Sequence, residues 1–208
     1  MKINTHIVSD LPVVVIDDYY DENAVEKIWN EICFLSSGDK LLDPSKTGSA
    51  TDTSDPSQKR LKKKNKGIFL DEVYINREVS DILIENRKTF SEPVVNKLIE
   101  IHPIFRYFRV CNIDFSLLSY YENSDYYEPH MDEAFVSVCS WFYKRPKKFE
   151  GGSLIFENKL HVDCEFNRTV IFPSVLEHAV DPIKLDEEYK NKNFGRYTIT
   201  QLLSRQRG

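Results

Sequence analysis

The residues best suited to bind a metal ion are His130 and Asp132, which stand two positions apart. Side chains alternate between the two faces of a β-strand, so a histidine and a carboxylate at this spacing point the same way and can reach one ion. His178, which follows a Pro173-Ser174 turn, is the candidate third ligand. Two histidines and one carboxylate on one face of an iron ion leave three coordination positions open, the arrangement of non-haem iron oxygenases.

A second pair with the same spacing, His161 and Asp163, is the alternative ligand pair. It ends only 15 residues before His178, which is about one hairpin and leaves little chain to build the opposite wall of a site. The glycine pair Gly151-Gly152 separates His130 from His178, but it does not separate His161 from His178. Because glycines allow a tight turn into the next strand, we favour His130 and Asp132 and interpret the second pair as polar residues on a strand face.

Arg196 is the candidate for binding an organic anion. An isolated arginine on a C-terminal strand is usually a surface salt-bridge partner, but Arg196 follows the ordered series of His130, Asp132, the glycine pair and His178. Many non-haem iron oxygenases use 2-oxoglutarate as a cosubstrate. This molecule chelates iron through its keto-acid end and leaves a carboxylate at the other end. A guanidinium matches that carboxylate with two parallel hydrogen bonds. Thr198 shares the strand face of Arg196 and could add a hydroxyl hydrogen bond.

The stretch from about residue 113 to 203 resembles the catalytic core of the 2-oxoglutarate/Fe(II) oxygenase superfamily, particularly its prolyl 4-hydroxylase-like branch. The residues that carry the resemblance are Tyr121, Tyr127, His130, Asp132, the run Phe149-Glu150-Gly151-Gly152, the run Phe172-Pro173-Ser174, His178 and the run Arg196-Tyr197-Thr198. By resemblance, Tyr121 assists Arg196 at the cosubstrate carboxylate. Its neighbour Tyr120 leaves that assignment open, since an aromatic residue in such a strand is otherwise part of the core.

The resemblance implies a fold, a set of cofactors and an activity. The fold is mostly β, a double-stranded β-helix (a cupin-like jelly roll) with N-terminal α-helices packed on it. The cofactors are Fe(II), 2-oxoglutarate as cosubstrate and O₂, with ascorbate a candidate reductant, and no side chain beyond the metal ligands is expected to act in catalysis. The activity is hydroxylation of a C–H bond, coupled to decarboxylation of 2-oxoglutarate to succinate.

The substrate expected first is a prolyl or other residue of a protein or peptide. The alternatives are a small molecule or free amino acid, or a cupin-like binding module without catalysis. A groove at the site would favour a chain substrate, and a closed pocket would favour a small ligand.

Several positions distinguish this chain from other branches. The gap from His178 to Arg196 is 18 residues, which is longer than in many related enzymes, and we expect Lys184 to Asn193 to be an exposed, charged insertion that leaves Arg196 in place. The prolyl hydroxylase branch often has lysine at the Arg196 position. Gln201 stands where nucleic-acid demethylases tend to carry a second arginine, which counts against that class. Asp132 is the carboxylate that halogenating relatives lose, so halogenation is not expected.

The elements that must position these residues divide the chain into an N-terminal support, 1–105, and a β-rich core, 106–208, in a single domain. We expect a strand over 12–17, a helix that begins after the N-cap Asp21, and helical structure over 78–100 with a break near 91–93. The runs expected to form strands are 107–120, 134–143, 153–157, 168–173, 177–180 and 195–203.

The segment 43–59 is rich in Ser, Thr, Asp and Pro, and we expect a mobile loop. Together with the basic cluster after it, over 43–66, it is either a lid for the site or a disordered, solvated insertion. The cluster consists of Lys59, Arg60, Lys62, Lys63, Lys64 and Lys66. A solvated face is the usual role of such a run, and an acidic partner is the alternative.

Composition narrows the function classes further. The chain has 208 residues and a net charge of −5, so a general nucleic-acid binder is not expected. The four cysteines are widely spaced, as expected for buried free thiols. The first ten residues lack the apolar core of a signal peptide, and no stretch approaches a membrane span, so we expect a cytoplasmic protein with no membrane partner. The sequence leaves the oligomeric state open.

Overall fold

The computed structural model describes residues 2–48, 51–52 and 60–206. Its largest element is a sheet of seven antiparallel strands. In spatial order these are β1 (Lys2–Val8), β2 (Leu11–Asp17), β13 (Thr169–Pro173), β9 (Val136–Phe142), β16 (Arg196–Ser204), β7 (Ile113–Tyr121) and β6 (Lys66–Phe69). The central strand β9 is buried along its whole length, so both faces of this sheet are covered.

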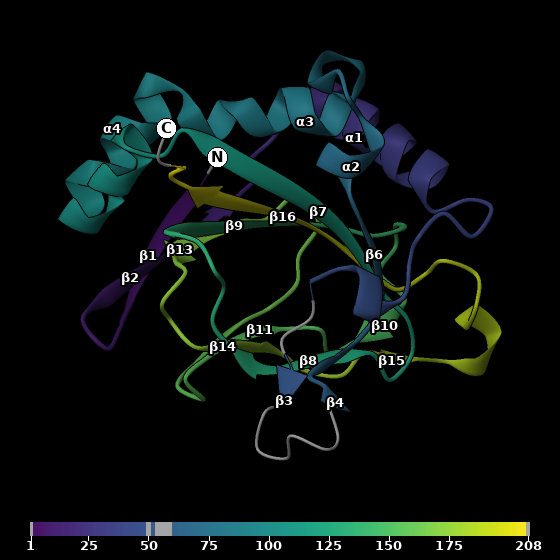
Figure 1. Cartoon of the computed structure of the whole chain (residues 1–208). Helices are drawn as coiled ribbons and strands as arrows, with labels where there is room; N and C mark the ends of the chain where they lie inside the picture. Colours follow the sequence, from purple (N-terminus) through teal and green to yellow (C-terminus); the bar gives the residue numbers. More distant parts are fainter. Residues whose placement is uncertain (1, 49–50, 53–59, 207–208) are drawn as a thin grey trace.

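A smaller sheet of five strands lies below the large one in Figure 1. Its order is β12 (Leu160–Val162), β11 (Leu154–Phe156), β14 (His178–Val180), β8 (Tyr126–His130) and β5 (Lys63–Lys64). Two short antiparallel pairs complete the β structure, β10 (Phe149–Glu150) with β15 (Lys184–Leu185) and β3 (Thr51–Asp52) with β4 (Arg60–Leu61). Two facing antiparallel sheets form the expected jelly roll, and the predicted fold class is confirmed.

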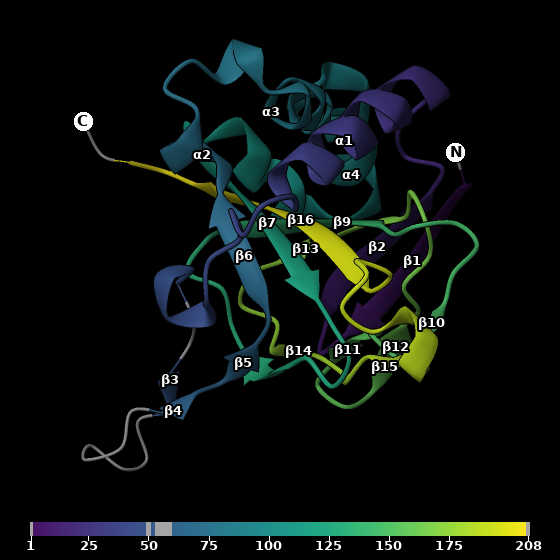
Figure 2. The same ribbon diagram turned by 90° about the vertical axis from the view of Figure 1, so that its right-hand side faces the viewer.

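The helices cover the outer face of the large sheet, on the side away from the small sheet (Figures 1 and 2). They are α1 (Glu22–Leu35), α2 (Leu70–Val73), α3 (Asp81–Asn86) and α4 (Glu92–Ile101), and the 3₁₀ turns are 44–46, 77–79, 87–90, 103–109 and 187–189. As predicted, Asp21 caps α1, because its carboxylate accepts a hydrogen bond of 2.9 Å from the backbone N–H of Ala24. None of the described helices is long and apolar enough to cross a membrane.

Strand alternation divides the buried side chains into two cores. On β16, Tyr197 and Ile199 face the helices, where they pack with Ile28 of α1 among other residues. The alternate residues, Arg196 and Thr198, face the space between the two sheets and line a cavity there. The two faces of one strand therefore serve two purposes, attachment of the helical layer and construction of a polar site.

The sequence predicted the support layer well in some places and wrongly in others. The strand at 12–17 and the break before the helix at Glu92 are confirmed. The expected strand start at 107 is wrong, since Pro103–Arg109 is a 3₁₀ helix and β7 begins at Ile113. The first strand, β1, was not predicted, because it lies at the sheet edge and is largely exposed.

The expected loop at 43–66 contains more regular structure than its composition suggests. Its described residues include a 3₁₀ turn at Pro44–Lys46 and the short strands β3, β4 and β5. Positions 49–50 and 53–59, which include Lys59, lie outside the described residues. The described residues of the basic cluster therefore lie partly in short strands, since Arg60 belongs to β4, which pairs with β3, and Lys63 and Lys64 form β5, which pairs with β8.

The junction that leads into Arg196 requires glycine. A Cβ atom at Gly195 would lie 2.0 Å from the backbone oxygen of Tyr121 on the neighbouring strand β7, a distance that only a backbone shift can relieve. We expect Gly195→Ala to destabilise the fold by about 1–3 kcal/mol in chemical denaturation. The control is Ser204→Ala at the other end of β16, with an expected change below about 0.5 kcal/mol. Equal stability of the two variants would show that the close approach is not a constraint.

Candidate metal centre and cosubstrate cavity

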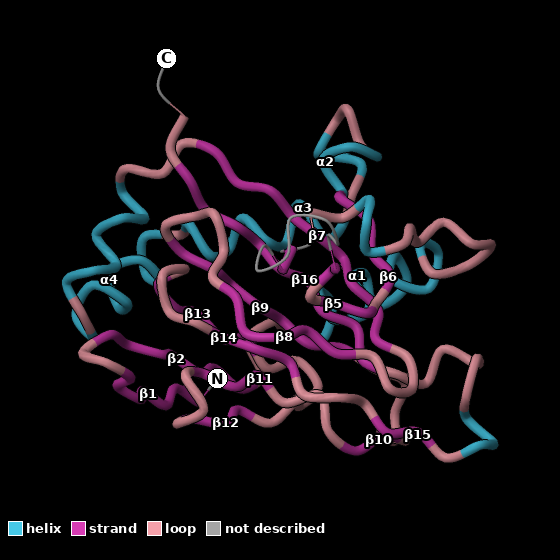
Figure 3. Tube along the Cα trace, turned by 60° about the horizontal axis from the view of Figure 1, so that its bottom comes forward, coloured by secondary structure: helices cyan, strands magenta, loops and turns pink. Residues whose placement is uncertain are grey.

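The three predicted metal ligands come together between the sheets. His130 ends β8 and His178 begins β14, and these two residues are direct partners in the antiparallel pairing of the strands. Asp132 follows β8 by two residues. Its carboxylate oxygens lie 3.6 Å from His130 Nε2 and 3.5 Å from His178 Nε2. Figure 3 shows β8 and β14 side by side, the arrangement that places the two imidazoles on one side of the site.

The backbone fixes which nitrogen of each imidazole faces the site. His130 Nδ1 lies 2.8 Å from the carbonyl oxygen of Glu128, and His178 Nδ1 lies 2.9 Å from that of Leu176. When each Nδ1–H donates to its carbonyl, the lone pair of Nε2 is free for a cation. Both histidines use the carbonyl two residues earlier in the chain, so the same local device orients both ligands.

The carboxylate is also held in place. Ser137 Oγ donates a 2.6 Å hydrogen bond to Asp132 Oδ2, and Ser174 Oγ lies 2.7 Å from Ser137 Oγ. Burial and the neighbouring His178 both lower the pKa of His130, which keeps its imidazole neutral and able to coordinate. Two imidazoles and one oriented carboxylate fit Fe(II) and leave the rest of its coordination sphere to other ligands.

The alternative pair is not part of this centre. His161 and Asp163 are both exposed, and Asp163 accepts a hydrogen bond from Ser153 Oγ. Within residues 2–48 and 60–206, His130, Asp132 and His178 form the only group of three or more metal-binding side chains whose ligand atoms come within 4.8 Å of one another. The structure therefore brings together the favoured set and leaves the other pair on the surface.

Arg196 is a buried cation with unused hydrogen-bonding capacity. Its side chain is 1% exposed, and its Nε and Nη1 atoms have no hydrogen-bond partner among residues 2–48, 51–52 and 60–206. The guanidinium lies close to two aromatic rings, 5.0 Å from the centre of Tyr121 and 5.1 Å from that of Trp141. Because an uncompensated buried charge is unfavourable, this arrangement calls for an anion in the adjoining cavity.

The three residues expected around the cosubstrate line one cavity with the metal ligands. Thr198 Oγ1 is buried without a partner in the described part of the chain, as are the two nitrogens of Arg196. Tyr121 is the direct cross-strand neighbour of Arg196 and also lines the cavity. Tyr120 faces the helical core instead, where its hydroxyl donates to Glu122 at 2.6 Å. On this geometry Tyr121, and not Tyr120, is the tyrosine within reach of a ligand.

The glycine pair allows the chain to pass close to Arg196. Gly151 and Gly152 both have positive φ angles, 72° and 73°. A Cβ atom on Gly152 would lie 2.3 Å from a side-chain atom of Ile183 and 3.2 Å from the Arg196 side chain. The long connection from His178 to Arg196 returns through β15, which pairs with β10, and Arg196 keeps its place.

Two further residues of the cavity were not predicted, Lys63 and Asn65. Lys63 is 4% exposed, its Nζ donates a 2.8 Å hydrogen bond to the carbonyl of Thr47, and burial lowers its pKa to about 8. The basic run that contains it was interpreted as a solvated face, and this is wrong for Lys63. A pairing of β5 with β8 turns it inwards, and no sequence pattern in the run indicates that pairing.

The cavity is small and opens beside a larger groove. It has a volume of about 80 Å³, whereas the adjoining groove measures about 480 Å³ and shares Tyr127 and Asp132 with it. A larger hollow of about 740 Å³ lies elsewhere, against α1, and contains none of the metal ligands. The chemistry is therefore confined to the small cavity and its mouth.

Metal addition tests the ligand assignment. We expect Mn²⁺, an inert substitute for iron, to raise the melting temperature of the wild type, with about 2.7 kcal/mol of stabilisation at 100 times the dissociation constant. Asp132→Ala removes the only anionic ligand and should abolish this rise, while Asp163→Ala should retain it. The assignment is wrong if Asp132→Ala binds metal normally and Asp163→Ala does not.

Comparison with known proteins agrees with the geometry. Residues 115–203 match the 2OG-Fe(II) oxygenase superfamily, and this range contains the three ligands and Arg196. No curated protein matches the chain significantly.

Solved structures of prolyl hydroxylases share the fold. One, from Trichoplax adhaerens in complex with a peptide fragment of the hypoxia inducible factor oxygen degradation domain, has a TM-score of 0.61 and 15% identity, over 92% of this chain and 83% of that chain. A prolyl-4-hydroxylase from Pseudomonas putida has a TM-score of 0.59 and 13% identity, over 94% and 93% of the two chains. The viral collagen prolyl hydroxylase of Paramecium Bursaria Chlorella virus-1 has a TM-score of 0.51 and 11% identity, over 94% and 96%.

The family match, the fold and the metal-binding geometry together argue against the alternative of a cupin-like binding module without catalysis. Residues 115–203 are therefore identified as a 2OG-Fe(II) oxygenase domain, and the chain as a 2-oxoglutarate-dependent dioxygenase with a prolyl 4-hydroxylase-like fold.

Proposed function

We propose that this dioxygenase hydroxylates a residue of a protein or peptide chain, with proline the first candidate. The observation that carries the proposal is the groove of about 480 Å³ that adjoins the metal site. A small molecule is usually held in an enclosed pocket, whereas an extended chain needs an open surface beside the reacting centre. The peptide complex of the Trichoplax enzyme, which has a similar fold, supports the same class of substrate.

The groove has the surface that a peptide would contact. It is lined by the apolar side chains of Phe69, Phe115 and Met131, and Met131 is 60% exposed. Tyr127 and Asp132 belong both to the groove and to the inner cavity. A side chain of a peptide in this groove would therefore reach the metal end of the cavity without displacing the buried residues behind it.

We further propose that Arg196, with Tyr121 and Thr198, binds the carboxylate of 2-oxoglutarate that does not face the metal. The unpartnered nitrogens of Arg196 and the unpartnered hydroxyl of Thr198 would then all gain hydrogen bonds. His130, Asp132 and His178 would hold the metal, and the metal together with 2-oxoglutarate would supply the oxidation of a C–H bond by O₂. These side chains bind, orient and exclude water, and none needs to donate or accept a proton.

Mass spectrometry of treated lysates tests the substrate class. Wild-type protein, supplied with Fe(II), 2-oxoglutarate and ascorbate, should add one oxygen atom to peptides of at least one protein in the lysate, and Asp132→Ala should not. Localisation of the added oxygen by fragmentation identifies the hydroxylated residue. Oxygen addition to free metabolites and to no peptide would contradict the proposal and favour a small-molecule substrate.

A further inference from the structure

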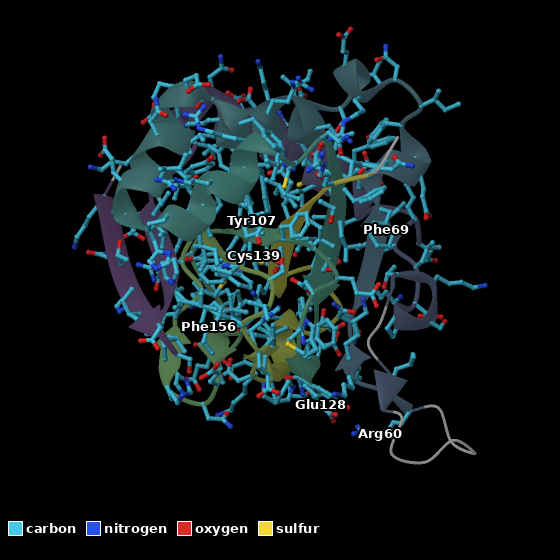
Figure 4. The ribbon with its side chains drawn as sticks, turned by 60° about the vertical axis from the view of Figure 1, so that its left-hand side comes forward. Arg60, Phe69, Tyr107, Glu128, Cys139 and Phe156 are labelled. Atoms are coloured by element: carbon cyan, nitrogen blue, oxygen red, sulfur yellow. The ribbon has the colours of Figure 1, made fainter. Side chains whose placement is uncertain are left out.

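The cavity contains a second buried cation, Lys63, in addition to Arg196. Lys63 enters from β5, which is far from the metal ligands in sequence and lies against β8. The residues just before β5 also contact β8, since Arg60 of β4 forms a two-pronged ion pair with Glu128, at 2.6 and 2.7 Å, and Lys62 Nζ donates to the carbonyl of Pro129. Figure 4 shows Arg60 and Glu128 together at this edge of the molecule.

The charge of Lys63 lies at the metal end of the cavity. Its Nζ is 5.5 Å from the centre of the Tyr127 ring, and that ring stacks on His130 with a centroid distance of 3.5 Å. Asp132 and His130 both interact electrostatically with Lys63. Arg196 instead packs against Tyr121 and Trp141.

The charges that line the cavity favour an anion with two negative groups. The charged side chains around it are Lys63, Arg196 and Asp132, two cations and one carboxylate. A divalent metal on Asp132 adds two more positive charges to the same small volume. The single hydrogen bond from Lys63 to the Thr47 carbonyl does not neutralise its charge. A dicarboxylate with one group near each cation would compensate both.

We propose that Lys63 binds the carboxylate at the keto-acid end of 2-oxoglutarate, so that Lys63 and Arg196 hold the two ends of the cosubstrate. This inference rests on the proposed role of Arg196, which fixes the direction of the cosubstrate in the cavity. Lys63 is then a binding residue that a 2-oxo acid needs in addition to the metal.

Equilibrium binding to the Mn²⁺-loaded protein without O₂ tests the proposal independently of turnover. The two probes are 2-oxoglutarate and 2-oxopentanoate, which keeps the keto-acid end and lacks the distal carboxylate. Lys63→Met should raise the dissociation constants of both probes by a similar factor, about tenfold. A charge-assisted contact at the keto-acid end, which both probes have, is worth roughly 1.4 kcal/mol or more. The affinity for Mn²⁺ alone should not fall, because the substitution removes a nearby positive charge.

Two further variants control for structure. Lys63→Gln can still donate a hydrogen bond towards Thr47 but lacks the charge, so it should match Lys63→Met if charge is what matters. Lys64→Met removes the same charge from the next residue, whose ammonium group contacts Ser124 and Asp125, and should leave both dissociation constants unchanged. Melting curves of each variant show whether the fold is retained.

The possible results separate this inference from the assignment of Arg196. Unchanged affinities in Lys63→Gln, a loss for 2-oxoglutarate alone, or a parallel loss of Mn²⁺ affinity would each overturn the role of Lys63. Arg196→Met should weaken 2-oxoglutarate and leave 2-oxopentanoate unaffected. If Arg196→Met binds 2-oxoglutarate normally, the cosubstrate assignment fails, whatever the Lys63 variants show.

Discussion

His178 pairs directly with His130 where β14 meets β8, and the metal centre depends on this one register. A slip by one residue would turn one imidazole to the opposite face of the sheet, because strand side chains alternate. The same backbone that sets the register also orients each ring, since both Nδ1 atoms contact a carbonyl two residues earlier. Asp132 needs only the short turn after β8, and the Ser137 hydroxyl holds it towards both histidines. The ligand geometry is therefore a property of backbone pairing and of the backbone carbonyls that orient the two rings.

The second constraint is the positive charge that Arg196 and Lys63 place in the small cavity between the sheets. Arg196 enters the cavity from the strand whose other face carries the helical layer, so the residues that stabilise the fold also fix the position of the guanidinium. Two aromatic rings lie close to its charge but accept no strong hydrogen bond, and its Nε and Nη1 have no partners among the described residues. With Lys63 at the metal end, the cavity is suited to an anion and unsuited to a neutral ligand of the same size. The groove beside it is lined by large apolar side chains and by the carboxylates of Asp71, Glu72 and Glu133, a different character that is consistent with separate sites for cosubstrate and substrate.

Much of this site could be predicted from the order of its motifs. His130 with Asp132 had little value alone, since His161 with Asp163 has the same spacing, and the glycine pair, His178 and Arg196 in sequence gave the pattern its specificity. Lys63 could not be predicted, because its burial follows from pairing of β5 with β8, a contact between segments more than 60 residues apart. The segment 107–112 was misjudged because its aromatic residues suit either a strand or a helical turn, and packing decided for the turn. β1 has few buried residues, so hydrophobic alternation, the signal that identified 12–17, is weak there.

The assignment of iron to His130, Asp132 and His178, and of 2-oxoglutarate to Arg196 in the same cavity, is tested most directly by substrate-independent conversion of 2-oxoglutarate to succinate, measured with Fe(II) and O₂ supplied. We expect slow succinate formation by the wild type and its loss in both His130→Ala and Arg196→Ala, with circular dichroism used to check that each variant is folded. Undiminished succinate formation by either variant would contradict it.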